Sequence, residues 1–307
     1  MSRLAFLFPG QGSQAVGMGK SFYEHYSLAR ELFARADEIL GYPISRLCFE
    51  GPDEELRLTQ NTQPALLIVS TIAHALFGRE PAIAAGHSLG EYSALVAAGS
   101  LRFEDALRLV HNRGRYMQEA VPVGQGAMAA VLGMSHEDLS QALSRVQSGV
   151  VQIANWNSQE QLVIAGHKQA VEEALKLAKP PRSVILPVSA PFHSALMKVA
   201  EDRLASDLDQ VELKDLKFPI VTNVDAKIIR TGVAARDSLK RQVSRPVLWF
   251  KSMELLAGET IDAFLELGAG KVLTGLIKRI GRSWPHPFAT GNIEDRESLE
   301  KIQGLGL

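Results

Sequence analysis

Residues 82–96 read Ala82-Ile83-Ala84-Ala85-Gly86-His87-Ser88-Leu89-Gly90-Glu91-Tyr92-Ser93-Ala94-Leu95-Val96. The first four residues predict a short buried strand, and the positions of Leu89, Tyr92 and Val96 predict a helix with one apolar side. Between them lies the pattern Gly-x-Ser-x-Gly, which is typical of a serine on a sharp strand-to-helix turn. The new helix points its free N–H groups back at Ser88, where they would stabilise an oxyanion. The alternative is a glycine-rich turn with an ordinary serine.

The composition indicates a globular protein with a large core. Of the 307 residues, 46% are hydrophobic and 22% are charged, which favours one large domain or one domain with an insertion. The formal net charge of −1 gives no overall attraction to nucleic acid or to a membrane surface. Cys48 is the single cysteine, so no intrachain disulfide can form and a reducing compartment is expected. No apolar run is as long as a membrane span or a signal peptide, which predicts a cytoplasmic protein.

Strand-like and helix-like segments alternate in the first part of the chain and again after residue 191. Leu4 to Phe8 are continuously apolar, as in a buried parallel strand, and Pro9-Gly10-Gln11-Gly12-Ser13-Gln14 follow as a polar loop. Such a loop is either a plain connection or part of a site at the carboxyl end of the sheet. Helices are expected at 28–40 and from Pro64 to Leu76, and a further strand at 263–267. The alternation predicts an α/β fold.

The pattern changes between residues 124 and 190. Strands are expected at 127–132, 150–154, 161–165 and 184–188, with a polar turn at 155–160 and helices through Leu139 and Val171. The order β-α-β-β-α-β is that of a ferredoxin-like unit. We therefore expect a ferredoxin-like small subdomain at 124–190, inserted into a core made of 1–123 and 191–307.

The helix expected from Phe103 to about Val121 carries an arginine beside its apolar face. Arg108 and Arg115 point away from that face, whereas Arg113 lies at its flank. An unpaired buried charge is costly, so Arg113 needs a partner. The alternatives are a structural ion pair, a side chain that reaches solvent, and a clamp for an anionic substrate group.

A nucleophilic serine needs a base, and the sequence offers three histidines for consideration. His87 adjoins Ser88, but a neighbour on a tight turn points elsewhere and is expected to pack locally. His286 lies between two prolines and is expected at the surface. His193 lies where the chain returns from the insertion, and the spacing favours it slightly over the others. The histidines are otherwise scattered, so no metal site is expected.

Several separated motifs resemble those of the malonyl-CoA:acyl carrier protein transacylases, in the same order and over nearly the whole chain. They are Pro9 to Gln14, Gly86 to Tyr92, Asn112-Arg113-Gly114, Ala190-Pro191-Phe192-His193-Ser194, Asn223-Val224-Asp225, Arg241-Gln242 ahead of Pro246-Val247, and Glu266 to Leu273. The resemblance implies an α/β-hydrolase-like core with a parallel sheet and the inserted ferredoxin-like subdomain. It also implies transfer of a malonyl group from malonyl-CoA to the phosphopantetheine thiol of acyl carrier protein, for fatty-acid synthesis, by a ping-pong mechanism without cofactor or metal.

The resemblance implies roles for individual residues. Ser88 would be the nucleophile, and His193 would be its base. Arg113 would bind the malonyl carboxylate. Gln242 would hold His193 through its backbone carbonyl, in place of the acid of a triad.

Further residues would shape the site on the same grounds. Gln11 and the backbone N–H of Leu89 would form the oxyanion hole, and Asn157 would line the site. Phe192 stands before the histidine, where some members have serine. In related polyketide acyltransferase domains a phenylalanine there accompanies malonyl over methylmalonyl selection, because the ring crowds a methyl group at C2.

The implied carrier protein is acidic, so a basic surface should flank the opening of the site. The candidates are Lys240, Arg241 and Arg245, and also Lys271, Lys278, Arg279 and Arg282. Solvated helix faces are the alternative for most of these residues. No nucleic acid or membrane partner is expected, and we expect a monomer.

Two other classes of function compete with this prediction, besides malonyl transfer in a polyketide pathway. A serine esterase or thioesterase usually has its histidine late in the chain, whereas more than a hundred residues follow His193, and no triad acid is evident. A carrier-binding module without chemistry would not need both Ser88 and His193.

Overall fold

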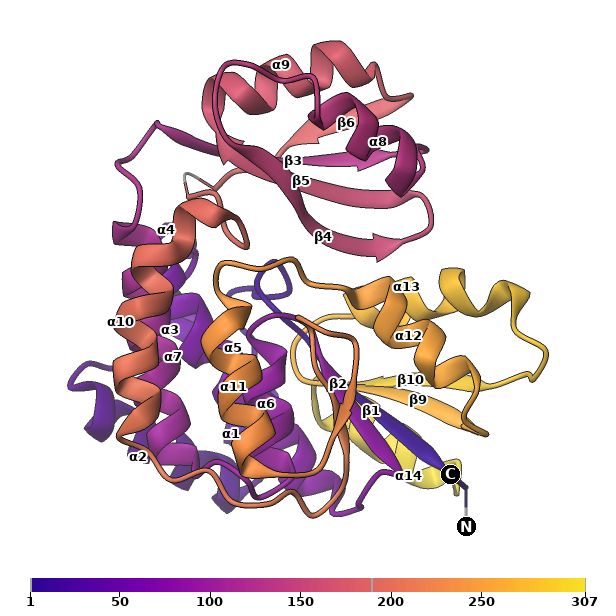
Figure 1. Ribbon diagram of the computed structural model, residues 1–307. Helices are drawn as coiled ribbons and strands as arrows, with labels where there is room; N and C mark the ends of the chain where they lie inside the picture. Colours follow the sequence, from indigo (N-terminus) through magenta and orange to yellow (C-terminus); the bar gives the residue numbers. More distant parts are fainter. Residues whose placement is uncertain (1, 189, 307) are drawn as a thin grey trace.

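The computed structural model describes residues 2–188 and 190–306, which form a six-stranded sheet with helices on both faces and a separate four-stranded sheet (Figure 1). The larger sheet has the order β10-β9-β1-β2-β7-β8. Its strands are β1 (Leu4–Phe8), β2 (Ile83–Gly86), β7 (Ile220–Val221), β8 (Ile228–Ile229), β9 (Ala263–Leu267) and β10 (Ala289–Ile293). All neighbours pair in parallel except β7 and β8. The prediction of an α/β core with a parallel sheet is confirmed.

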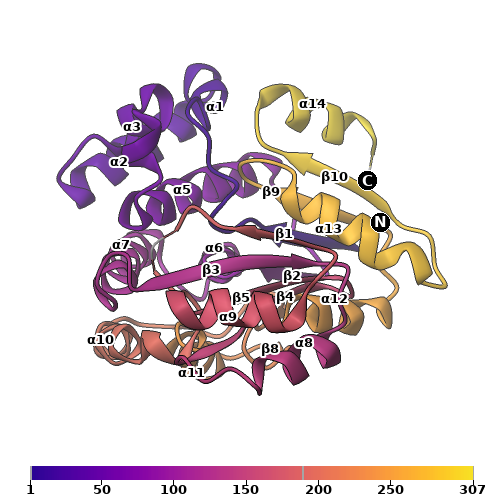
Figure 2. The same cartoon turned by 90° about the horizontal axis from the view of Figure 1, so that it is seen from above.

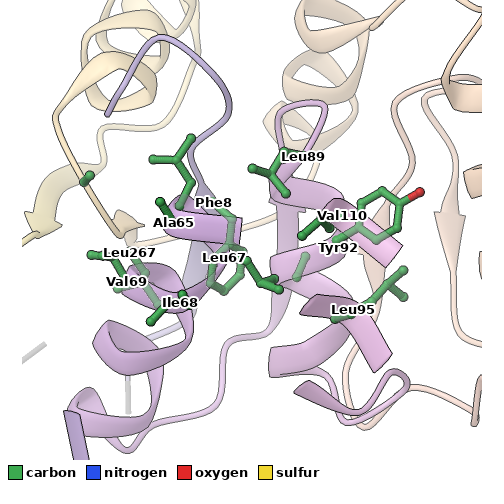
Figure 3. Packing of buried hydrophobic residues seen from close by; sticks show 14 of the residues in the cluster. Phe8, Ala65, Leu67, Ile68, Val69, Leu89, Tyr92, Leu95, Val110 and Leu267 are labelled. Carbon is green, nitrogen blue, oxygen red and sulfur yellow. The ribbon is translucent and has the colours of Figure 1, made fainter. Parts of the chain in front are cut away.

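Alternate side chains of β1 enter two different cores. Leu4, Phe6 and Phe8 join the main hydrophobic cluster, while Ala5 and Leu7 join a second cluster on the opposite face of the sheet. The main cluster contains α5 (Thr59–Phe77), α6 (Gly90–Ala97) and α7 (Phe103–Glu119), whose side chains pack together with Phe8 in Figure 3. The second cluster contains α12 (Trp249–Ala257) and α13 (Val272–Ile280).

The remaining helices of the larger unit surround this frame. They are α1 (Lys20–His25), α2 (Ser27–Leu40), α3 (Ile44–Glu50), α4 (Asp53–Leu56), α10 (Lys198–Asp209), α11 (Gly232–Gln242) and α14 (Arg296–Gly304).

The smaller sheet is antiparallel and has the order β4-β5-β3-β6. It consists of β3 (Gly126–Leu132), β4 (Val151–Ser158), β5 (Gln161–His167) and β6 (Arg182–Ile185), with the helices α8 (His136–Leu143) and α9 (Lys168–Ala178). These helices cover the outer face of the sheet, and Figure 2 shows α9 lying across it. Met128, Val163 and Ala165 point the other way and belong to the main cluster. The ferredoxin-like order is confirmed, while the exact limits of 124–190 stay a prediction.

Two backbone hydrogen bonds join β4 to the larger unit. Trp156 N–H donates to Val247 C=O at 2.9 Å, and Val247 N–H donates to Ala154 C=O at 2.8 Å. The edge strand of the small sheet is therefore fastened to the chain between α11 and α12. This contact brings the small sheet over the carboxyl ends of β1 and β2.

Three local predictions are wrong. Pro64 lies inside α5 and does not open it. Proline leaves the carbonyl of Gln60 without its helical donor, and His111 Nδ1 hydrogen-bonds to that carbonyl at 3.1 Å. The expected polar turn at 155–160 belongs to β4 as far as Ser158, and β6 comes two residues earlier than expected.

Candidate active site

Ser88 lies on a turn that only small neighbours allow. Its φ is 51°, in the left-handed region, between the end of β2 at Gly86 and the start of α6 at Gly90. A Cβ atom on Gly86 would lie 1.9 Å from the backbone of Gly90, and one on Gly90 would lie 2.0 Å from the carbonyl oxygen of Phe8. Both positions therefore require glycine.

Asn223, just beyond β7, clamps the same turn. Its Oδ1 accepts a hydrogen bond from Ser88 N–H at 2.6 Å, and its Nδ2 donates to Gly86 C=O at 2.6 Å. The amide thus satisfies two backbone groups of a turn that cannot satisfy them itself. The neighbouring strand holds the serine in place.

His193 Nε2 lies 2.7 Å from Ser88 Oγ. Its Nδ1 lies 3.0 Å from Gln242 C=O and 3.2 Å from Arg245 C=O. Because both carbonyls are acceptors, Nδ1 carries the hydrogen and Nε2 is free to accept the serine proton. The φ of His193 is 58°, so both members of the pair have left-handed backbone.

Burial, and then the positive charge of Arg113, lower the pKa of His193 to about 3. The imidazole is therefore neutral in the free protein at physiological pH. A neutral imidazole is the form that can act as a base.

Arg113 of α7 is 1% exposed, and its hydrogen bonds go to neutral groups. Nη1 donates to Gln63 Oε1 at 2.8 Å, and Nη2 donates to Gln242 Oε1 at 2.9 Å and to Ser88 Oγ at 3.0 Å. Its buried Nε has no partner among residues 2–188 and 190–306. Of the three alternatives for this side chain, the ion pair and the reach to solvent do not occur within the described parts of the chain.

Gln242, at the end of α11, contacts most of the site from behind. Its backbone carbonyl accepts from His193, and its side-chain oxygen accepts from Arg113. Its Nε2 donates to Ser88 C=O at 3.0 Å and to Glu91 Oε2 at 2.8 Å. One side chain therefore connects Ser88, Arg113 and a buried carboxyl group.

That carboxylate, Glu91 in the first turn of α6, is fully buried. Besides Gln242, Asn223 N–H donates to Oε2 at 3.0 Å and Ser238 Oγ donates to Oε1 at 2.8 Å. Burial raises the pKa of Glu91, while these donors and the charge of Arg113 oppose the rise.

A cavity of about 120 Å³ opens above Ser88, between the large and small units. It is lined by Gln11, Gln63, His87, Ser88, Leu89, Arg113, Met117, Met128, Asn155, Leu186, Val188, Phe192 and His193. The wall combines polar side chains with apolar ones, among them Leu89, Met117, Met128, Leu186 and Val188. Such a space accommodates a small acyl group with one charged end.

Six of the residues singled out in the sequence line this cavity, and two do not. Gln11, Ser88, Leu89, Arg113, Phe192 and His193 do so. Gln242 lies one layer behind. Asn157 Oδ1 instead accepts a hydrogen bond from His87 Nε2–H at 2.8 Å, and this contact ties β4 to the turn beside Ser88.

The groups expected in the oxyanion hole, Gln11 and Leu89, line the same cavity as Ser88. Within the described residues, the N–H of Leu89 donates to no other group. The side chain of Gln11 donates a long hydrogen bond, 3.4 Å, to Thr59 Oγ1.

Sequence reasoning missed Gln63, Asn155 and the apolar wall of Met117, Met128, Leu186 and Val188. Two signals were available. Gln63 belongs to a polar run in an otherwise apolar helix, and Met117 lies one helical turn after Arg113. No comparable signal marks the residues of the small sheet, because their orientation depends on how that sheet sits on the core.

Within residues 2–188 and 190–306, no group of three or more His, Cys, Asp or Glu side chains could hold a metal ion. None of the helices in those ranges has the length and apolar character to cross a membrane.

Comparison with known proteins gives one consistent result. A family model described as the acyl transferase domain matches residues 5–302. The malonyl CoA-acyl carrier protein transacylase of Escherichia coli K12 is 49% identical over 288 residues, which cover 91% of this chain and 93% of that protein. The protein of the same name from Bacillus subtilis strain 168 is 46% identical over 308 residues, covering 98% and 96%.

Solved structures agree with the sequence relatives. An acyl carrier protein S-malonyltransferase from Vibrio cholerae has a TM-score of 0.94 and 43% identity, covering 98% of this chain and 100% of that one. A malonyl-transacylase solved in complex with its type II PKS acyl-carrier protein has a TM-score of 0.95 and 42% identity, covering 99% and 100%.

Proposed function

The chain belongs to the malonyl-CoA:acyl carrier protein transacylase family, and we propose on that premise that it transfers a malonyl group from malonyl-CoA to the phosphopantetheine thiol of an acyl carrier protein. The transfer proceeds through a malonyl ester on Ser88 and serves fatty-acid synthesis. The observation that carries the proposal is the position of Ser88 Oγ, 2.7 Å from His193 Nε2 and 3.0 Å from Arg113 Nη2.

In the first half of the reaction, Ser88 attacks the thioester carbonyl of malonyl-CoA while His193 Nε2 takes the hydroxyl proton. The carbonyls of Gln242 and Arg245 stabilise the imidazolium through Nδ1–H. The N–H of Leu89 and the amide of Gln11 receive the negative oxygen of the tetrahedral intermediate. Collapse of the intermediate breaks the carbon–sulfur bond, and His193 returns its proton to the departing CoA thiolate.

The second half reverses these steps with a new thiol. The phosphopantetheine thiol gives its proton to His193 and attacks the malonyl ester. The ester bond to Ser88 breaks, and the proton on His193 returns to the serine oxygen. CoA, the first product, leaves before the acyl carrier protein, the second substrate, binds, which is the ping-pong order.

Selection of malonyl rests on Arg113 and the small cavity. The planar guanidinium matches the free carboxylate of the acyl group, and bidentate pairing would place the thioester over Ser88. Phe192, which is 7% exposed, lies in the cavity wall and limits room for a branch at C2.

We also propose that the protein acts in the cytoplasm, as a monomer and without a cofactor. The nucleophile, the base and the carboxylate-binding group all belong to this chain, so the chemistry proposed needs no further group.

The test is the mass of the intact protein after incubation with malonyl-CoA. The wild-type chain should gain one malonyl group, and adding acyl carrier protein with its phosphopantetheine arm should remove that group and load the carrier. Ser88→Ala should gain none. A stable malonyl adduct on Ser88→Ala would remove Ser88 from its role, and release of free malonate without loading of the carrier would favour an esterase.

A further inference from the structure

Two buried side chains that can carry opposite charges, Arg113 and Glu91, lie near Ser88 without touching each other. Arg113 is 1% exposed and Glu91 is fully buried, yet no ion pair joins either side chain to another within residues 2–188 and 190–306. A buried charge without compensation is strongly destabilising. Arg113 and Glu91 therefore each need a group of opposite charge nearby, and each can be that group for the other.

A single side-chain amide bridges them. Gln242 Nε2 donates to Glu91 Oε2 at 2.8 Å, and Gln242 Oε1 accepts from Arg113 Nη2 at 2.9 Å. The opposite charges act on each other across this bridge, since Glu91 favours the charged form of Arg113 and Arg113 favours that of Glu91.

The chemistry of the carboxylate decides how the bridge is oriented. An ionised carboxylate only accepts hydrogen bonds, so it requires the NH₂ end of Gln242. Ser88 C=O is a second acceptor on the same NH₂ group. The oxygen of Gln242 must then face Arg113, and this contact holds Nη2 beside Ser88 Oγ.

We propose that Glu91 is the counter-charge of Arg113 and acts, through the side-chain amide of Gln242, as a positioning residue for the carboxylate-binding guanidinium. The inference rests on the proposed function for its consequence, which is selectivity for dicarboxylic acyl groups. A carboxylate in direct contact with Arg113 would occupy the guanidinium and compete with the substrate. Glu91 is separated from Arg113 by the side-chain amide of Gln242, so it compensates the buried positive charge without occupying the guanidinium. The Nε of Arg113 still has no partner within the described ranges.

The first test is a stability cycle of four proteins: wild type, Glu91→Gln, Arg113→Met and the double variant. Glutamine keeps the size of Glu91 and can still accept from Asn223 and Gln242, so this substitution chiefly removes charge. Each single variant should melt below wild type because it leaves one uncompensated charge. The double variant should lose clearly less than the sum of the two single losses.

Additive losses would overturn the proposal. If Glu91→Gln alone does not fold, the double variant decides: folding of the double variant supports the pairing, and failure of the double variant to fold shows that Glu91 is needed for another reason. This cycle requires no activity, so it remains decisive even if the proposed function is wrong.

The second test measures loading of malonyl and acetyl groups on Glu91→Gln by mass. Malonyl loading should fall roughly tenfold or more, the effect of one weakened hydrogen bond to a charged group, while acetyl loading should stay within about threefold of wild type. Ser238→Ala is the matched control, because it removes a donor to the other carboxylate oxygen without touching Gln242. It should keep the wild-type ratio of the two rates. Equal losses for both substrates in Glu91→Gln, or an unchanged ratio, would contradict the positioning role.

Discussion

Ser88 Oγ lies between the imidazole of His193, which can accept a proton, and the guanidinium of Arg113, which can only donate hydrogen bonds. Arg113 Nη2 is a donor, so the serine oxygen accepts from it at 3.0 Å and its own proton points to His193 Nε2 at 2.7 Å. The free protein is therefore already arranged for proton transfer to His193.

Arg113→Ala should separate substrate binding from folding. Malonyl loading should fall roughly 10- to 100-fold or more, because a hydrogen bond to a charged group contributes about 1.5–3 kcal/mol. Acetyl-CoA has no free carboxylate, so its loading should be spared or improved. Both loading rates and the melting curve of this one variant are needed. Equal loss for both substrates with a lowered melting temperature would show a purely structural role, and normal malonyl loading by a stable variant would remove Arg113 from the site.

The low pKa of His193 predicts the pH dependence of loading with acetyl-CoA, which carries no titrating carboxylate of its own. At a pKa of about 3, the imidazole stays neutral, so the wild-type rate should not fall between about pH 7 and about pH 5 on account of His193. Removing the positive charge of Arg113 makes protonation easier and raises this pKa. The acid limb of Arg113→Ala should therefore lie at higher pH than that of wild type. An acid limb at the same pH in both proteins would show that the charge does not act on His193.

Some residues of the site could be predicted from the sequence, and others could not. Ser88 and Arg113 stand out, one by its glycines and the other by its place on a helix face. Asn155 and Asn157 could not be told apart, because β4 has register shifts at 153/155 and 156/158 against β5. Such bulges re-aim side chains, so Asn155 faces the cavity and Asn157 meets His87.

At the scale of elements, β2, the turn and α6 work as one unit because α6 packs directly against β1. Gly90 lies against the carbonyl oxygen of Phe8, so the helix approaches the strand at a distance no side chain permits. Ser88 owes part of its position to this contact between two backbones.

Gly90→Ala should therefore lower stability and loading together. A methyl group forced into this contact costs roughly 1–3 kcal/mol and displaces the turn that carries Ser88. Gly275→Ala in α13 is the control, since nothing lies within 4 Å of the added atom. It should raise stability by about 0.5–1 kcal/mol, as alanine does in a helix, and leave loading unchanged. Melting curves and loading rates check both, and a Gly90→Ala protein as stable as wild type would disprove the close contact.

Elements with a strong apolar pattern were predictable, and elements made by tertiary contacts were not. The runs at 4–8 and 263–267 are strands because they are buried on both faces. β10 reads Ala-Thr-Gly-Asn-Ile and is mostly only partly buried, and it escaped prediction because it is a strand only by pairing with β9. The start of α5 was misplaced since proline ordinarily begins helices, and here the donor from His111 allows it inside one.

At the scale of the whole molecule, the structure divides the basic candidates for carrier docking into two classes. Lys240 pairs with Asp209, Arg241 pairs with Asp225 and Asp237, and Lys271 pairs with Glu294. Lys278, Arg279, Arg282 and Arg245 are exposed and make no ion pair within the described part of the chain. The first three of these lie together on α13 and the turn after it, and form a cluster with uncompensated charge.

Reversing the charge of Lys278, Arg279 and Arg282 together should raise KM for the acidic carrier protein and leave malonyl loading from malonyl-CoA unchanged. The same reversal at Lys240 and Arg241, which already have acidic partners, should have a smaller effect on KM. Steady-state transfer at two salt concentrations checks this, because an electrostatic effect shrinks as salt rises. If KM changes in neither set of variants, the carrier protein docks elsewhere.

Ser88 and His193, the two residues proposed to react, both have left-handed backbone, which disfavours most amino acids by roughly 1–2 kcal/mol each. Glycine alone adopts these angles freely, and it has neither a hydroxyl nor an imidazole. At these two positions, stability therefore favours glycine, whereas the proposed activity requires serine and histidine. Glycine at 88 or 193 would relieve this backbone strain but remove the hydroxyl or the imidazole, so the strain at these two positions supports the proposed reaction.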